Sequence, residues 1–146
     1  MAVRLFLCRK AAKNFSTKII LKQRSQTIKK ISLLVMSVLY VIAGINHFIS
    51  PLFYKQIMPP YIPWHMPLIY VTGILEIILG ILLIPIFTRR IAAWGIIILL
   101  ILVFPANINM MINYWQEENP DLWITILRLP LQFVLIWWAY TFTKQA

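Results

Sequence analysis

The chain has 146 residues, of which 61% are hydrophobic and 12% charged, and its net charge is +10. This composition excludes an ordinary soluble globular domain and predicts an integral membrane protein. The length accommodates four membrane-spanning helices with short connections and leaves no room for a separate catalytic domain.

Residues 1–30 form a basic N-terminal tail that carries nine of the 14 basic residues and no acidic residue. Such a tail next to a membrane span attracts anionic lipid on the cytoplasmic face. An organelle transit peptide has a similar composition and stays open as an alternative. No nucleic-acid-binding fold is recognisable here, so we do not expect a nucleic-acid partner. The single cysteine, Cys8, cannot form an internal disulfide, so a thiol-redox role would need a cofactor or a partner.

Residues 31–146 contain four apolar stretches that follow the tail. Each stretch has about the 20 residues that a helix needs to cross the hydrocarbon core. Backbone polar groups in lipid must be satisfied within the segment, so we expect helices. The fold class is therefore all-α, an integral membrane four-helix bundle. The predicted spans are 31–49, 68–87, 91–112 and 122–142.

The basic residues that flank the spans predict the orientation. Lys29 and Lys30 precede the first span, Arg89 and Arg90 separate the second from the third, and Lys144 follows the fourth. All of these positions lie on one side, which the positive-inside rule makes cytoplasmic. Both termini are therefore expected in the cytoplasm. The opposite side holds Lys55, Glu117, Glu118 and Asp121.

The connections between the spans differ in length. A short turn is expected at Thr88–Arg90, which makes the second and third helices antiparallel neighbours. The extracytoplasmic loop at residues 50–67 contains five prolines, which prevent a long helix. Its aromatic residues suit the membrane interface. We interpret this loop as a lid on the outer mouth of the bundle, and an ordinary aromatic belt is the alternative.

Ionisable and amide side chains gather in the outer half of the predicted bundle. Placed by the helical rise of 1.5 Å per residue, they all lie within the outer half of their spans. Such groups are unfavourable in lipid and usually face the bundle interior. Pro105 and Pro130 lie at similar depth, and each leaves a backbone carbonyl without its helical donor. We expect a polar, ligand-binding cavity formed by His47, Glu76, Asn107, Arg128 and Gln132.

Glu76 is the one acidic residue within a predicted span, and Arg128 is the one base there with a fixed charge. The planar guanidinium suits a carboxylate, so an ion pair between them is expected. Gly73 and Gly80 lie on the face of Glu76 and permit close helix packing. Two interpretations stay open: a binding or proton-handling site, and a structural ion pair that only fixes the helix register.

Several kinds of site are not expected. One histidine and one glutamate within the spans make a poor metal site. No serine–histidine–acid set and no glycine-rich phosphate loop is visible. The sequence therefore implies no metal and no covalently attached cofactor, and it does not decide whether the protein is an enzyme.

Seven short motifs resemble those of the DoxX family of small bacterial membrane proteins, over about residues 31–140. The motifs are Ala43–Phe48, Pro51–Tyr54, Met58–Tyr61, Gly73–Glu76, Arg89–Ala93, Val103–Asn107 and Arg128–Gln132. The resemblance implies a four-helix bundle in the bacterial plasma (inner) membrane. The DoxX family takes its name from a terminal quinol oxidase system, and some relatives associate with thiol-redox proteins. The resemblance therefore also implies membrane or redox protein partners. The five cavity residues are motif positions in this resemblance, without known catalytic roles.

Three functions are compatible with these expectations. The first is a redox-associated subunit that binds a small amphipathic, quinone-like molecule in the polar cavity. The second is a non-enzymatic membrane scaffold or assembly factor, in which the ion pair serves helix packing. The third is a small transporter or channel subunit, although the apolar inner half of the bundle argues against a continuous polar path in one protomer.

Overall fold

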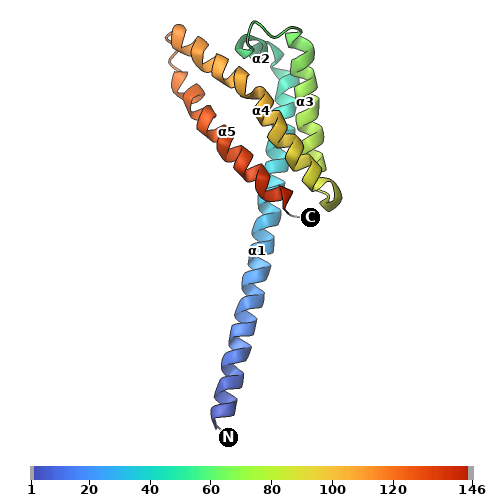
Figure 1. The fold of residues 1–146 in the computed structure, drawn as a ribbon, viewed down its shortest axis with the longest axis vertical. Coiled ribbons are helices and arrows are strands. Elements are labelled where there is room, and N and C mark those ends of the chain that lie inside the picture. Colours follow the sequence, from blue (N-terminus) through green and yellow to red (C-terminus); the bar gives the residue numbers. More distant parts are fainter. Residues whose placement is uncertain (1, 145–146) are drawn as a thin grey trace. The chain divides into compact units, whose positions relative to one another are not determined.

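The computed structural model describes residues 2–144, with the side chains of Lys18 and of residues 20–144. The described residues form four long helices and one short helix (Figure 1). One compact unit ends at Val35 and a second begins at Met36. The helices are α1 (Ala2–Ile49), α2 (Pro51–Ile57), α3 (His65–Leu82), α4 (Ile86–Gln116) and α5 (Leu122–Thr143).

Four helical segments are long and apolar enough to cross a membrane. They are Ile20–Ile49, His65–Leu82, Ile86–Gln116 and Leu122–Thr143. Large apolar side chains on these helices stay exposed, among them Leu102 at 69% and Phe133 at 61%, as expected for surfaces that contact lipid. The prediction of an all-α chain with four helices that are long and apolar enough to span a membrane is thus confirmed.

Helix α4 lies at the centre of the second unit. It packs against α3 on one side and α5 on the other, and α2 contacts both α3 and α4. Its buried face includes Ala92, Ala93 and Ile96, each fully inaccessible. Small alanines allow close approach of neighbouring helices. Helix α2 and the α4–α5 connection lie at one end of this unit, and the α3–α4 connection lies at the other (Figure 1).

The connection between α3 and α4 falls earlier than the sequence suggested. Helix α3 ends at Leu82, and Pro85 precedes α4 in an extended conformation. The expected turn at Thr88–Arg90 is therefore wrong, because these residues form the first turns of α4. A proline disfavours helical backbone in the residue before it, which ends α3 early. Thr88 Oγ1 donates to Leu82 O at 2.6 Å and so satisfies a carbonyl at the end of α3.

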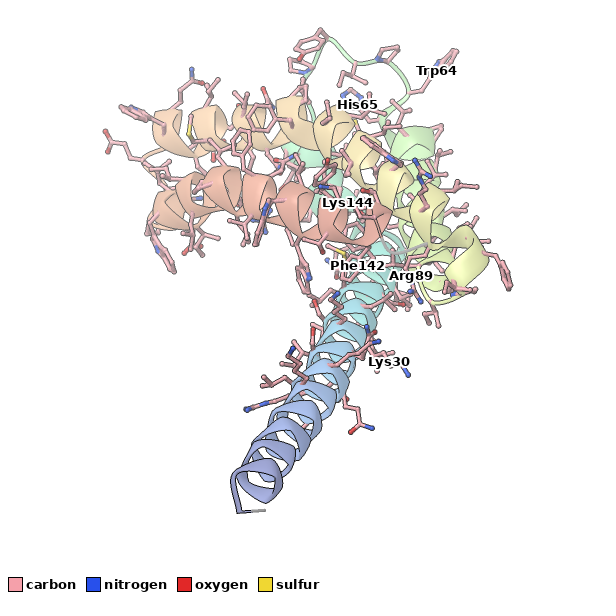
Figure 2. The ribbon with its side chains drawn as sticks, turned by 60° about the horizontal axis from the view of Figure 1, so that its bottom comes forward. Lys30, Trp64, His65, Arg89, Phe142 and Lys144 are labelled. Atoms are coloured by element: carbon pink, nitrogen blue, oxygen red, sulfur yellow. The ribbon has the colours of Figure 1, made fainter. Side chains whose placement is uncertain are left out.

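The connection between α1 and α3 is partly helical. Helix α2 has Pro51 at its first position. A proline is tolerated there because the backbone N–H of the first helical residue has no partner within the helix. The chain then turns through Trp64, which has a left-handed backbone with φ of 57°. The Trp64 side chain is 79% exposed and projects away from the ribbon (Figure 2). Asn109 Nδ2 donates to Ile57 O at 3.1 Å and attaches the end of α2 to α4.

Candidate functional site

A partly open cavity of about 220 Å³ lies in the half of the second unit that carries α2. All five helices contribute side chains to its wall. Most of the surrounding helix surface is apolar, so a polar wall at this depth is unusual for a membrane protein. The polar side chains that line the cavity are His47, Tyr54, Thr72, Glu76, Asn107 and Arg128.

Glycines bring α1 and α3 together beside this cavity. A Cβ atom on Gly73 would lie 2.7 Å from His47 Cβ and 2.9 Å from Gly44 O. One on Gly80 would lie 2.9 Å from Ser37 O, and Ser37 Oγ donates to Gly80 O at 2.6 Å. Only residues without a side chain permit this approach. The glycines therefore set the distance between the two helices that carry His47 and Glu76.

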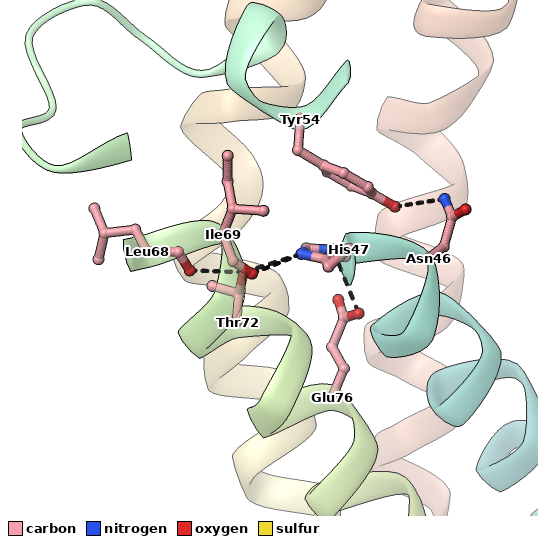
Figure 3. Close-up of polar contacts among 7 residues, drawn as sticks. All are labelled: Asn46, His47, Tyr54, Leu68, Ile69, Thr72 and Glu76. Carbon is pink, nitrogen blue, oxygen red and sulfur yellow. Dashed lines mark hydrogen bonds and ion pairs between the residues drawn. The ribbon is translucent and has the colours of Figure 1, made fainter. Parts of the chain in front are cut away.

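His47 lies between a backbone carbonyl and the carboxylate of Glu76 (Figure 3). Its Nδ1 is 3.0 Å from Ile69 O and 3.2 Å from Thr72 Oγ1, and its Nε2 is 3.5 Å from Glu76 Oε2. The side chains of His47 and Glu76 are only 10% and 14% exposed. The carboxylate is thus held by α3 against an imidazole from α1, largely out of contact with solvent or lipid.

The acceptor beside Nδ1 determines where the protons of this pair lie. A carbonyl oxygen can only accept, so the contact with Ile69 O requires a proton on Nδ1. Thr72 Oγ1 has carbonyl acceptors of its own at 2.9 and 3.0 Å, so its proton is engaged there. In a neutral imidazole with Nδ1 protonated, Nε2 is a bare acceptor. Two acceptors repel each other, so the contact of Nε2 with Glu76 Oε2 is favourable only when a further proton lies between them. That proton is either on the carboxyl group or on Nε2.

Tyr54 covers the pair from α2. Its ring centroid is 3.8 Å from that of His47, with an interplanar angle of 31°. Asn46 Nδ2 donates to the Tyr54 hydroxyl at 3.0 Å, so the hydroxyl proton stays available for another acceptor. Burial raises the pKa of Tyr54 above its ordinary value, and the Asn46 hydrogen bond opposes this only in part. The phenol is therefore a neutral donor at physiological pH.

Arg128 does not form the ion pair that the sequence predicted. Among the described residues, Glu76 pairs with His47, and no carboxylate lies within ion-pairing distance of the guanidinium. Arg128 Nη1 instead donates to Met110 Sδ at 3.4 Å. The reason is helix order: α4 lies against both α3 and α5, so it places Met110 beside the arginine. Glu76 and Arg128 still line the same cavity.

Asn107 and Gln132 join α4 to α5 next to the cavity. Asn107 Nδ2 donates to Gln132 Oε1 at 2.8 Å, and Gln132 Nε2 donates to Leu100 O. Gln132 is 3% exposed and lies behind Asn107, which lines the cavity. The acceptor Leu100 O belongs to the residue before Ile101. The carbonyl of Ile101 has no helical donor, because Pro105 lacks an N–H. Four of the five predicted residues thus line the cavity, and Gln132 supports the wall.

Comparison with known proteins assigns this region to a family. Residues 36–143 match the model of a family described as a domain of unknown function, DUF8561. The chain belongs to the DUF8561 family. No match was found among the curated proteins or among the solved structures.

The DUF8561 match and the second compact unit begin at the same residue, Met36. Every residue that lines the cavity lies within the match, so the site is part of the DUF8561 domain. The basic tail at residues 1–30 lies outside it. Among the described residues of the domain, no group of three histidine, cysteine or acidic side chains is arranged to hold a metal ion.

Several contributors to the DUF8561 site escaped the sequence analysis. The sequence places Tyr54 in the predicted lid and indicates no contact for it. Thr72 gives no clear signal, because a threonine in an apolar helix usually bonds to its own backbone. Thr72 indeed does so, but it also lies against His47 Nδ1. One signal was available: Thr72 and Glu76 are four residues apart, so they share a helix face.

Proposed function

We propose that the protein binds a small amphipathic molecule, with its polar head group in the cavity and its apolar tail along the lipid-facing helices. The observation that carries this proposal is the convergence of polar side chains from five helices on one cavity of about 220 Å³. Sites for whole drug-sized ligands enclose about 300–1,000 Å³. A smaller cavity suits a head group alone, and the exposed apolar surface offers a place for a tail.

A quinone is the first ligand to test. Quinone oxygens accept hydrogen bonds, and Arg128 and the Tyr54 hydroxyl are donors at the cavity wall. The pair of His47 and Glu76 supplies a group that can hold or release a proton. We therefore propose a DoxX-like, redox-associated subunit, and the motif resemblance supports this choice. Electron transfer would be the task of a partner protein.

Binding of a quinone with a decyl tail to the purified full chain tests this function. Glu76→Gln should change the affinity about tenfold, because a hydrogen bond to a charged group contributes about 1.5–3 kcal/mol. Glu117→Gln is the matched control, since Glu117 is exposed at the end of α4 and does not line the cavity. If neither the quinone nor any other amphipathic probe binds, the proposed function fails.

We also propose that the N- and C-termini face the cytoplasm of a bacterial cell and that the spans lie in its plasma membrane. The basic residues Arg89, Arg90 and Lys144 support this orientation, because they lie at the end of the unit opposite α2. Two variants, Trp64→Cys and Lys144→Cys, each in a Cys8→Ser background, provide the test. An impermeant thiol reagent should label the cysteine at 64 in intact cells and the one at 144 only after lysis.

A membrane scaffold is the second candidate. The observation in its favour is that His47 and Glu76 lie beside the Gly44–Gly73 contact, where a buried pair can also fix the helix register. Exchanging the two residues, His47→Glu with Glu76→His, separates the candidates. A scaffold tolerates the exchange and retains its partner proteins, whereas ligand binding is lost because the proton-holding group has changed its place.

A further inference from the structure

The charges at the cavity wall do not balance. His47, Glu76 and Arg128 are the charged or proton-exchanging groups that line it, apart from the neutral phenol of Tyr54. The contact with Ile69 O holds one proton on Nδ1, and the pair of His47 and Glu76 then shares one further proton between Nε2 and the carboxyl group. The pair is then either two neutral groups or two opposite charges. Its net charge is zero in both forms, so Arg128 is not compensated.

The described surroundings of Arg128 supply no anion. Its hydrogen bond runs to Met110 Sδ, and a thioether is a weak acceptor without charge. Lys55, on α2 near Tyr54, is exposed and has the same sign as the guanidinium. An uncompensated charge at this depth in a membrane helix is unfavourable, and charged groups there usually mark a functional site. An anion that enters the cavity would restore the balance.

We propose that the head group bound in the cavity is a carboxylate or a phosphate, and that Arg128 is the residue that binds it. This inference rests on the proposed function and specifies its ligand class. The planar fork of the guanidinium offers paired N–H donors that match both kinds of anion. Asn107 lies on the adjacent helix at the same wall. An acidic head group is thus favoured over a neutral quinone ring.

Ligands that share one tail and differ in the head group provide the test on the unmodified protein. Dodecanoate, dodecyl phosphate and dodecanol are titrated onto the full chain in a neutral detergent at about pH 8, where a carboxylic acid is ionised. We expect the anionic ligands to bind at least about tenfold more tightly than the alcohol. Equal affinity of dodecanol and both anions would overturn the inference.

Titrations with acetate and inorganic phosphate, which carry the same anionic groups without a tail, decide whether the ligand is amphipathic or a soluble anion. Weaker binding of these ions than of the dodecyl compounds supports an amphipathic ligand. Equal binding would overturn the amphipathic part of the proposal and indicate a soluble anion. If the decyl quinone binds and the anions do not, the proposed function stands and this inference fails. If nothing binds, both fail.

Variants then test the role of Arg128. Arg128→Gln should reduce the preference for dodecanoate over dodecanol by about tenfold or more. Arg90→Gln removes an exposed arginine outside the cavity and should leave the preference unchanged. Arg128→Lys keeps the charge without the fork, so it should retain part of the preference even if the glutamine variant does not fold. An unchanged preference in folded Arg128→Gln would overturn the assignment.

Discussion

His47 Nε2 lies 3.5 Å from Glu76 Oε2, and this contact joins α1 to α3 inside the membrane domain. Both side chains are nearly buried, and a second nitrogen of the same imidazole is engaged by the backbone of α3. The carboxylate is therefore partnered across one helix interface, at a point where two glycines bring the backbones close together. This relationship, and not the pair with Arg128, should dominate the energetics of Glu76.

A comparison of two double-mutant cycles tests this pairing. The first cycle combines His47→Ala with Glu76→Ala, and the second combines Glu76→Ala with Arg128→Ala. Residues in contact couple by about 0.5–3 kcal/mol in the free energy of unfolding, so the first coupling energy should exceed the second. Unfolding in mixed micelles measures both. A larger coupling between Glu76 and Arg128 would favour the ion pair expected from the sequence.

Gly73→Ala should destabilise the domain by about 1–3 kcal/mol, the usual effect of overpacking a tight interface. The new methyl group would lie 2.7 Å from His47 Cβ, and neither backbone can move without opening the α1–α3 contact. Gly95→Ala is the matched control, because its methyl group would meet Leu79 Cδ2, the movable end of a side chain. Thermal unfolding in detergent should show a clear loss for Gly73→Ala and little change for the control. Similar melting temperatures for both variants would contradict the close approach.

The sequence predicted the fold class well because hydrophobic length alone determines a membrane span. The predicted fourth span, 122–142, agrees with α5 to within one residue. The α3–α4 turn was misplaced because hydropathy continues past Pro85, and the backbone restriction before a proline outweighs hydropathy at that point.

The candidate site was predictable in its members but not in its contacts. Depth along each helix placed five polar residues in one half of the bundle, and the structure brings four of them to one cavity. Depth says nothing about helix order, however. The position of α4 between α3 and α5 decides that Arg128 contacts Met110, and the glycine contact decides that Glu76 contacts His47.

Gln132→Ala should lower the free energy of unfolding by about 1–3 kcal/mol, because it leaves the buried Leu100 carbonyl and the part-buried Asn107 amide without their partner. The Gln132 amide accepts from Asn107 Nδ2 and donates to Leu100 O, so each of these groups would lose a hydrogen bond. Gln116→Ala, at the exposed end of α4, removes the same side chain and serves as the control. Chemical unfolding of both variants compares them, and an equal effect would show that the α4–α5 hydrogen bonds add little.

Asn109→Ala should loosen α2 without unfolding the long helices. The Asn109 amide donates to Ile57 O at 3.1 Å, at the end of α2, and is a polar attachment of this short helix to α4. Hydrogen exchange followed by mass spectrometry should show faster exchange across residues 51–57 and unchanged exchange in α4. Asn113→Ala, one helical turn further along α4, is the control. Unchanged exchange of α2 in Asn109→Ala would mean that apolar contacts alone hold it.

The half-buried side chain of Tyr54 predicts a loss of stability in alkaline solution. Burial raises the pKa of Tyr54 above its ordinary value of about 10, so above that pH the unfolded chain releases a proton that the folded chain retains. The folded state then binds more protons than the unfolded state, and stability falls as the pH rises through this window. Tyr54→Phe removes the titrating group and should make the free energy of unfolding less dependent on pH above about 10. Tyr61→Phe, which removes an exposed hydroxyl, is the control. Identical alkaline profiles for the wild-type chain and Tyr54→Phe would show that the phenol is as accessible in the folded state as in the unfolded state, and would place α2 away from His47.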